Sequence, residues 1–242
     1  LKKEKTAKKQ TGTKTKWKPD LDVFTDINVR DEYFQDVLKR QAVVNPNLLF
    51  VYRFQKEDGS FEEKEFIYEN GITDYVNEIA AGENLTSVQN WSADRVGRDR
   101  EDKSEYKVKM EFALTFSNKI KKIEYYHNSS FLEHGGSPER AVKQAFVSQI
   151  DAYLKQNNKY LKNEKKITFD DVEDCLILVS SSFSTQTSYE NQTKKAITNK
   201  FIYETMTEFL KHQLEIYFIE NPDEALKIAE QVMVNKRSRE KA

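Results

Sequence analysis

The sequence predicts an α+β fold in which a mixed four-stranded sheet packs against helices. Residues 106–116 alternate apolar with mostly charged side chains, which is typical of a strand with one buried face. After two consecutive glycines, Val142, Phe146 and Ile150 recur at helical spacing and form one apolar stripe. We therefore expect this stripe to be buried against the strand, with a crossover connection at the glycine loop. Two long helices are expected at the C-terminal end.

The first third of the chain predicts a strand, a helix and a hairpin. Residues 12–18 alternate Thr or Trp with Lys, which indicates an exposed strand. A helix is expected from Asp31 to about residue 44, where an Asn-Pro pair ends it. Residues 48–54 and 62–68 read as two strands joined by a Glu-Asp-Gly turn.

The middle of the chain predicts a short helix at residues 72–79 and a possible strand at residues 87–91. Residues 121–127 are expected to be the antiparallel neighbour of the strand at residues 106–116. Ser137 can cap the helix that follows, because a proline stands next to it in the first turn.

The C-terminal third predicts one buried strand among helices. Thr168 resembles a cap before a short helix, and residues 175–179 form an apolar strand. A long helix is expected at residues 201–219, and Asn221-Pro222 begins the last helix. That helix opens with acidic and closes with basic residues, which suits the helix dipole.

Composition limits the possible classes of protein. The 242 residues suggest one large domain or two small ones, and 15 Phe and 12 Tyr are enough for a core. The net charge is -1, so no overall field favours nucleic acid, although residues 1–18 carry eight lysines and one glutamate. Such a basic end can contact DNA, but it is more often a solvated tail. Residues 1–10 are of low complexity, and we expect them to be mobile.

Little in the composition indicates a metal site or a membrane. The single cysteine, Cys175, and three scattered histidines predict no disulfide framework and no metal site. The chain has no apolar run of membrane-spanning length and no signal peptide, so we expect a cytoplasmic protein. It starts at Leu1 in a lysine-rich stretch, which suggests a fragment of something longer.

Residues 189–194 read Y-E-N-Q-T-K and follow a strand-like run. A lysine is a mobile point charge that can follow a phosphate, and a glutamine amide nearby can donate a second hydrogen bond. A Q-T-K triplet alone is more often a solvated loop. Here V-S-S-S-F-S-T-Q-T-S precedes it, and K-A-I-T-N-K, a long helix and E-N-P-D-E-A-L-K-I-A-E-Q follow. This series resembles the transducer domain of bacterial type II topoisomerase B subunits, the gyrase B and topoisomerase IV B family.

The resemblance implies a nucleotide contact. In that family the Q-T-K loop extends into a neighbouring ATP-binding domain, so Lys194 would be the catalytic residue that touches the γ-phosphate. Gln192 would bind the nucleotide beside it. Residues 10–13, Q-T-G-T, look like the family's K-T-G-T element, in which Thr13 would join the network that recognises adenine.

The resemblance also implies a division of the chain. Residues 17–24, W-K-P-D-L-D-V-F, look like the family's W-P-D-x-x-x-F segment. F-I-Y-E-N-G-I-T-D-Y-V is similar to the motif that marks the passage into the transducer domain. Residues 1–69 would then be the last strands and helix of a GHKL ATPase domain. Residues 70–242 would be a transducer of the ribosomal protein S5 domain 2-like fold.

One motif departs from the family. H-N-S-S-F-L-E-H-G-G-S-P corresponds to the family's N-N-I-x-T-x-E-G-G-T-H, but Ser137 and Pro138 replace its threonine and histidine. Asn70 likewise replaces a glycine of the earlier motif. These departures suggest a divergent branch, and no role is carried over from this loop.

The function that the resemblance implies is ATP-dependent type II DNA topoisomerase activity, an isomerase activity, of a full complex. The cofactors would be ATP and Mg²⁺. The partners would be double-stranded DNA, the A subunit (gyrase A or ParC-like) and a second copy of the B subunit on ATP binding. The fragment alone should be inactive, since it lacks the family's Mg²⁺-binding asparagine helix, glycine-rich lid and cleavage-domain carboxylates.

Two other hypotheses compete. One is a non-catalytic nucleic-acid-binding α+β module that uses the lysines of residues 2–18. The other is the related ATPases, the Hsp90 chaperones and MutL repair proteins. The Q-T-K loop followed by two C-terminal helices favours the topoisomerase family, within which gyrase and topoisomerase IV fit equally well.

Overall fold

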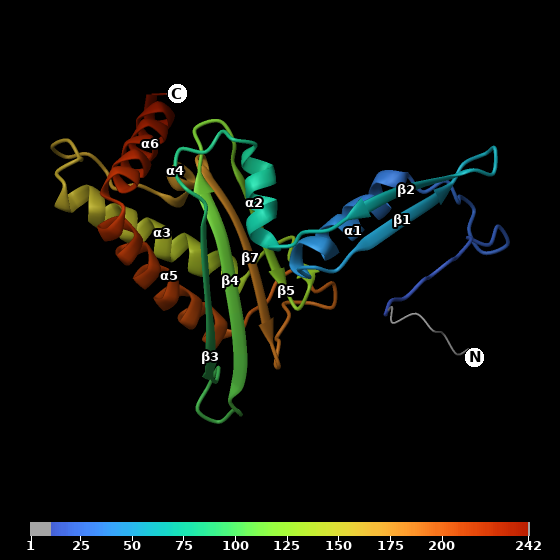
Figure 1. The fold of residues 1–242 in the computed structure, drawn as a ribbon. Helices are drawn as coiled ribbons and strands as arrows, with labels where there is room; N and C mark the ends of the chain where they lie inside the picture. The colour runs from blue at the N-terminus through green and yellow to red at the C-terminus, as the bar shows by residue number, and fades with distance from the viewer. Residues whose placement is uncertain (1–10, 242) are drawn as a thin grey trace.

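The centre of the molecule is a mixed five-stranded sheet (Figure 1). The computed structural model describes residues 11–241, so the expected mobility of residues 1–10 concerns residues outside the described part. The strands, in spatial order, are β3 (Gln89–Gly97), β4 (Tyr106–Phe116), β7 (Leu176–Ser184), β5 (Lys122–His127) and β6 (Ser130–Phe131). Four strands were predicted. The fifth, β6, has two residues, too few to show an alternating pattern.

The order of the strands corrects one prediction. β5 is not the neighbour of β4, because β7 lies between them, antiparallel to β4 and parallel to β5. The hairpin expectation rested on the tendency of consecutive strands to pair. β7 is apolar or small at nearly every position and is buried on both faces, which suits the central place in the sheet. The predicted crossover is confirmed, since parallel β5 and β7 are joined through helix α3 (Ser137–Gln156).

Helices cover both faces of the sheet (Figure 1). Together with α3, the long helices α5 (Lys200–Glu220) and α6 (Pro222–Lys241) lie on one face. The shorter α2 (Ile72–Ala80) packs on the other face. The short α4 (Phe169–Glu173) begins with the predicted cap at Thr168.

The apolar stripe of α3 is buried as predicted. Val142, Phe146 and Ile150 belong to one core with the apolar residues of β4. The Phe146 ring centroid lies 6.3 Å from that of Phe116. The alternation in β4 and the helical period in α3 therefore predicted the same interface from its two sides.

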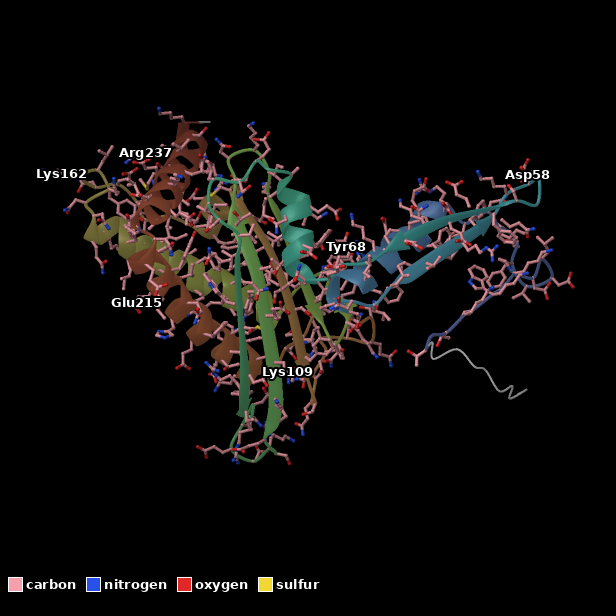
Figure 2. The ribbon with its side chains drawn as sticks, in the orientation of Figure 1. Asp58, Tyr68, Lys109, Lys162, Glu215 and Arg237 are labelled. Carbon is pink, nitrogen blue, oxygen red and sulfur yellow. The ribbon has the colours of Figure 1, made fainter. Side chains whose placement is uncertain are left out.

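The second core explains where the alternation in β4 ends. Lys107 and Lys109 are exposed on the lower part of the strand, where Figure 2 labels Lys109. Beyond Phe112 every residue of β4 is buried, because α2 covers the second face and packs on Ala113.

An N-terminal unit extends away from the sheet. It consists of α1 (Asp31–Val44) and the hairpin of β1 (Phe50–Gln55) and β2 (Phe61–Phe66), whose tip carries Asp58 (Figure 2). Tyr68 lies where the unit joins the rest of the molecule, and its hydroxyl donates to Glu78 Oε2 at 2.6 Å.

Two strand predictions in the first hundred residues need correction. Residues 12–18 form no strand, since within residues 11–241 they have no strand to pair with. Trp17 instead packs on Phe34 of α1, with ring centroids 5.5 Å apart. The strand expected at residues 87–91 is β3, which continues to Gly97 because it pairs along β4. In the described part of the chain, no helix has the length and apolar character to cross a membrane.

Replacing Phe146 by alanine should destabilise the protein by about 3–5 kcal/mol, because it leaves a cavity between α3 and the sheet. Urea unfolding of the chain measures this loss. Phe54→Ala is the matched control, since Phe54 is exposed on the hairpin and its removal should cost less than about 1 kcal/mol. Equal losses in the two variants would contradict this description of the core.

Candidate functional site

The Q-T-K residues lie on the loop between β7 and α5, residues 185–199. Tyr189 and Ile197 form an antiparallel bridge across the loop. The Glu190 N–H donates to the Ala196 carbonyl at 3.0 Å. Residues 190–196 are thus a closed tip on a paired stem.

Asn191 shapes the tip. Its side-chain oxygen accepts from the Thr193 N–H at 3.1 Å and from the Thr193 hydroxyl, and its carbonyl accepts from the Lys194 N–H at 3.3 Å. Lys194 is in the left-handed region, with φ of 55°. This turn leaves Gln192 and Lys194 exposed, so the structure brings the two predicted phosphate-contacting side chains onto one turn.

The Lys194 ammonium lies against an aromatic ring of its own loop. Its Nζ is 5.6 Å from the Tyr189 ring centroid, and Tyr189 packs against the main core. An exposed cation–π contact of this kind contributes about 0.5–1 kcal/mol. Within residues 11–241 Lys194 has no carboxylate partner, so only a weak contact must break before the ammonium meets an anion.

Thr13 is exposed in the segment before α1. Within residues 11–241 no hydrogen bond joins Thr13 to Gln192 or Lys194. Its part in adenine recognition stays a prediction.

The C-terminal side of the loop is fixed to the start of α3. The Ser137 N–H donates to the Ile197 carbonyl at 2.8 Å, and the Ser137 hydroxyl donates to the Asn199 carbonyl at 2.8 Å. The prediction that Ser137 caps α3 is wrong, because Gly136 occupies the cap position with φ of 84°. Only a glycine fits there, since an added Cβ would lie 2.2 Å from the Ile197 carbonyl oxygen.

A second link joins the tip to the glycine loop. The Lys195 ammonium pairs with Glu133 and lowers the pKa of that carboxyl. The Lys195 carbonyl accepts from the His134 N–H at 3.0 Å. The two neighbouring lysines thus differ, since the Lys195 ammonium pairs with Glu133 whereas the Lys194 side chain is exposed.

The N-terminal side of the loop is held by a histidine whose role the sequence did not indicate. His127 is completely buried at the end of β5. Its Nδ1 lies 2.8 Å from Ser182 Oγ, and its Nε2 lies 3.0 Å from both Ser184 Oγ and Thr187 Oγ1. Burial lowers the pKa of His127 to about 4, so the ring is neutral near pH 7. The only feature of the sequence that pointed to such a role for His127 was the run of hydroxyl residues after residue 179.

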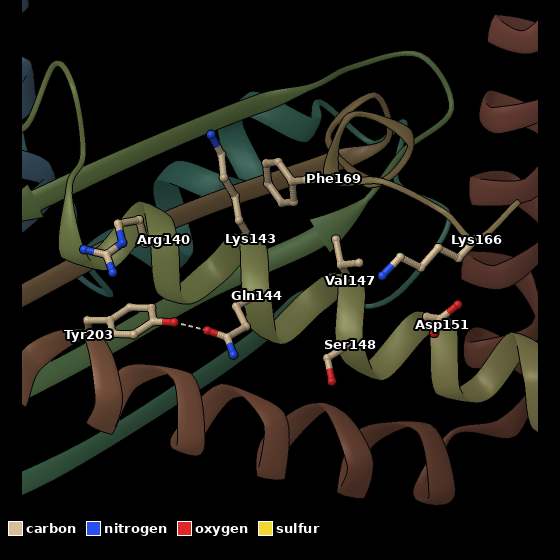
Figure 3. Close-up of a pocket in the computed structure, with 9 residues that line it drawn as sticks. All are labelled: Arg140, Lys143, Gln144, Val147, Ser148, Asp151, Lys166, Phe169 and Tyr203. Carbon is tan, nitrogen blue, oxygen red and sulfur yellow. Dashed lines mark hydrogen bonds between the residues drawn. The ribbon is translucent and has the colours of Figure 1, made fainter.

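An open groove of about 640 Å³ runs along α3 (Figure 3). The Arg140 guanidinium lies 4.5 Å from the Tyr203 ring, and Lys143 pairs with Glu139. Lys166 lies at the other end, near Asp151 (Figure 3). The lining thus carries three cationic side chains, Arg140, Lys143 and Lys166, and one carboxylate, that of Asp151. Among residues 11–241, no three His, Cys, Asp or Glu side chains are grouped so as to hold a metal ion.

The family of the chain follows from its sequence. The model of the family DNA gyrase B matches residues 71–242, more than half of the chain. The chain belongs to the DNA gyrase B family. The match covers the five-stranded sheet, helices α2 to α6 and the Q-T-K loop.

Individual gyrase B proteins match almost the whole chain. The DNA gyrase B protein of Metamycoplasma arthritidis is 28% identical over 236 residues, which are 96% of this chain and 36% of that protein. The DNA gyrase B protein of Mycoplasmoides gallisepticum is 25% identical over 226 residues, 92% of this chain and 35% of that protein. The chain thus spans about a third of the length of these curated relatives.

Solved structures share the fold. The 43K ATPase domain of Thermus thermophilus gyrase B superimposes with a TM-score of 0.66 at 20% identity, over 92% of this chain and 57% of that one. The topoisomerase IV ATP-binding domain of Francisella tularensis gives 0.64 at 23% identity, over 91% of this chain and 57% of that one. The α+β architecture of a mixed sheet with helices is therefore that of gyrase B ATPase-domain structures.

Replacing Gly136 by alanine should separate the loop from α3, because the new methyl group would collide with the Ile197 backbone. We expect a loss of about 3 kcal/mol in unfolding free energy, with faster hydrogen exchange at residues 196–199. Gly82→Ala is the matched control, since its φ of 81° gives the same backbone strain with no atom within 4 Å. If the two variants behave alike, the contact with Ile197 is unimportant.

The buried His127 should make stability fall in acid. Its pKa is lowered on folding from 6.5 to about 4, so the unfolded chain binds the extra proton first as the pH drops. The stabilisation is present above the unfolded pKa and decreases by roughly 2 kcal/mol by pH 5. Urea titrations at pH 7 and pH 5 measure this, and His127→Gln should lose correspondingly less over the same interval. An identical loss in the variant would show that other groups dominate.

Proposed function

We propose that this chain is the nucleotide-sensing and coupling segment of an ATP-dependent type II topoisomerase B subunit. The supporting observation is the turn at Asn191, which presents Gln192 and Lys194 to solvent from a loop fixed on both sides. The chain's membership of the DNA gyrase B family gives that turn its context. In this proposal residues 1–69 are the end of a GHKL ATPase domain and residues 70–242 are the transducer, of the ribosomal protein S5 domain 2-like fold.

The two side chains suit a phosphate. The Lys194 ammonium can leave the Tyr189 ring and follow the charge of a γ-phosphate, while the Gln192 amide donates a second hydrogen bond. ATP, when bound, supplies the phosphoryl group that is transferred to water. Thr13 would join adenine recognition. Among the described residues no three His, Cys, Asp or Glu side chains are grouped so as to hold a metal ion, and in this proposal the ligands of Mg²⁺ come from other parts of the complete protein.

The stem of the loop provides a route for coupling. Its C-terminal side is bonded through Ile197 and Asn199 to the start of α3, and Lys200 immediately begins α5. A displacement of the tip on contact with a phosphate would act on both helices. Rigid rotation of packed elements is a known form of such coupling.

The remaining parts of the proposal concern the complete enzyme. Its partners would be double-stranded DNA, an A subunit and a second copy of the B subunit, and its activity a change in DNA topology. The cations along the α3 groove, Arg140, Lys143 and Lys166, can contact DNA phosphates in a salt-dependent manner. The chain alone should not hydrolyse ATP, since it would contribute one wall of the site.

In the complete protein, Lys194→Ala should lower ATP turnover about a hundredfold and change nucleotide affinity much less. The reason is that a preorganised charge acts mainly where negative charge develops, and its removal typically costs about 2–4 kcal/mol of transition-state stabilisation. Steady-state ATPase rates and an equilibrium nucleotide titration measure the two effects. Gln192→Ala should act in the same direction but more weakly, because a neutral hydrogen bond is weaker than a charged one.

Lys195→Ala is the matched control for charge. It removes the same charge one residue later, where the ammonium pairs with Glu133. Turnover in this variant should stay within a few-fold of the parent. Near-normal turnover in Lys194→Ala would remove the proposed sensor role and leave Lys194 as a surface lysine.

A further inference from the structure

We propose that His127 is a positioning residue, whose two ring nitrogens fix the start of the loop at residues 185–199 and so set where Gln192 and Lys194 stand. The inference rests on the proposed role of that loop. His127 is too deeply buried to meet a nucleotide, and it acts only through the residues it holds.

The two nitrogens face different elements. Nδ1 lies 2.8 Å from the hydroxyl of Ser182, which is the partner of His127 in the parallel ladder of β5 and β7. Nε2 lies 3.0 Å from the hydroxyls of Ser184, the last residue of β7, and Thr187, which is in the loop. One ring therefore ties the sheet to the start of the loop.

The hydrogen-bond network assigns the tautomer. The Ser182 hydroxyl donates to the Tyr126 carbonyl at 3.3 Å, so it accepts from His127, and Nδ1 carries the proton. Nε2 of the neutral ring must then accept. The Ser184 hydroxyl donates to the Gln186 carbonyl at 2.6 Å, so of the two hydroxyls near Nε2 it is the Thr187 hydroxyl, which also lies 3.0 Å from Ser184 Oγ, that we assign as the donor to Nε2. The loop is thus bound through one defined donor, Thr187.

The next residue strengthens the same junction. Asn128 accepts from the Ser184 N–H at 3.0 Å through Oδ1. Its Nδ2 donates to the Thr187 hydroxyl at 3.1 Å and to the Ser184 carbonyl at 3.3 Å. Because the Thr187 hydroxyl donates to His127 and accepts from Asn128, the start of the loop has little freedom to move.

If the start of the loop is held less firmly, ATP turnover should fall more than nucleotide affinity. Misplacing a reacting partner by about 1 Å can cost about a hundredfold in rate, while affinity depends on the whole site. A merely structural histidine would instead change stability, with any side chain that fills the space serving equally well. The two nitrogens allow these explanations to be separated.

The experiment uses the complete protein with two amide variants of His127, each of which reproduces the position of one ring nitrogen. The amide of Gln extends to the position of Nε2 and can still accept from Thr187, whereas the amide of Asn extends only to the position of Nδ1. We expect His127→Gln to keep kcat for ATP within about threefold. We expect His127→Asn to lower it roughly tenfold with little change in KM. Hydrogen exchange at residues 185–195 should rise in the Asn variant and stay near the parent in the Gln variant.

A second pair tests the same contact from the loop. Thr187→Val keeps the shape and removes the donor, so it should match His127→Asn in kcat and in exchange. Thr185→Val is the control, since the Thr185 side chain is exposed and makes no hydrogen bond within the described residues. This pair keeps the inference testable even if substitution of His127 prevents folding.

The results separate this inference from the proposed function. Equal kcat and exchange in the Gln and Asn variants, or no change in Thr187→Val, would overturn the positioning role. If Lys194→Ala retains turnover, the sensor proposal fails, and the exchange measurements alone then decide whether His127 positions the loop. If Lys194→Ala abolishes turnover while Thr187→Val changes neither measurement, only the role of His127 fails.

Discussion

The parallel pairing of β5 with β7 is the constraint on which the rest of the structure depends. Parallel neighbours cannot be joined by a hairpin, so the chain must cross over through α3, and that crossover builds one layer of the core. Parallel strands also end at the same edge of the sheet. His127, the end of β5, and Ser184, the end of β7, therefore meet, and the Q-T-K loop begins at that meeting point.

The composition of β7 suits both its place between the two cores and its connection to the Q-T-K loop. Its first half is aliphatic and lies between the two cores, where Leu178 faces one and Val179 the other. Its second half is a run of serines, which is unusual for a strand buried on both faces. Ser182 is satisfied by His127 and the Tyr126 carbonyl, whereas Ser180 Oγ has no hydrogen-bond partner in the described part of the chain. Polar residues in a central strand cost stability unless they are paired, and here the pairing supports the loop.

The loop combines a fixed stem with a free tip. Thr187 and Ile197 tie its two sides to β5 and α3, and Asn191 closes the turn between them. At the tip, the side chains of Gln192 and Lys194 are exposed and have no strong partner in the described structure. Such a division suits a sensor, because a ligand at the tip meets side chains that are already placed, while its effect reaches helices that are rigidly attached.

How much of the fold and of the site could be predicted from the sequence depended on how far apart along the chain the interacting residues lie. The alternation in β4 and the stripe through Phe146 predicted their elements and their contact, because a buried face imposes its period directly on the sequence. The Q-T-K turn was also found from local residues. The place of β7 between β4 and β5 was not, since strand order depends on which pairing buries the most apolar surface over the whole chain.

The role of His127 could not be predicted from the sequence for the same reason. Its partners are 55 to 60 residues away along the chain, and a single histidine in a sequence reads the same whether it is a buried anchor or a surface ring. By itself the sequence determined the periodic elements, the turn residues and the motif that marks the family, because these depend on neighbours within a few residues. Only the tertiary structure decided the strand order, the glycine contact at Ile197 and the hydrogen bonds of His127, because each requires segments that the crossover brings together.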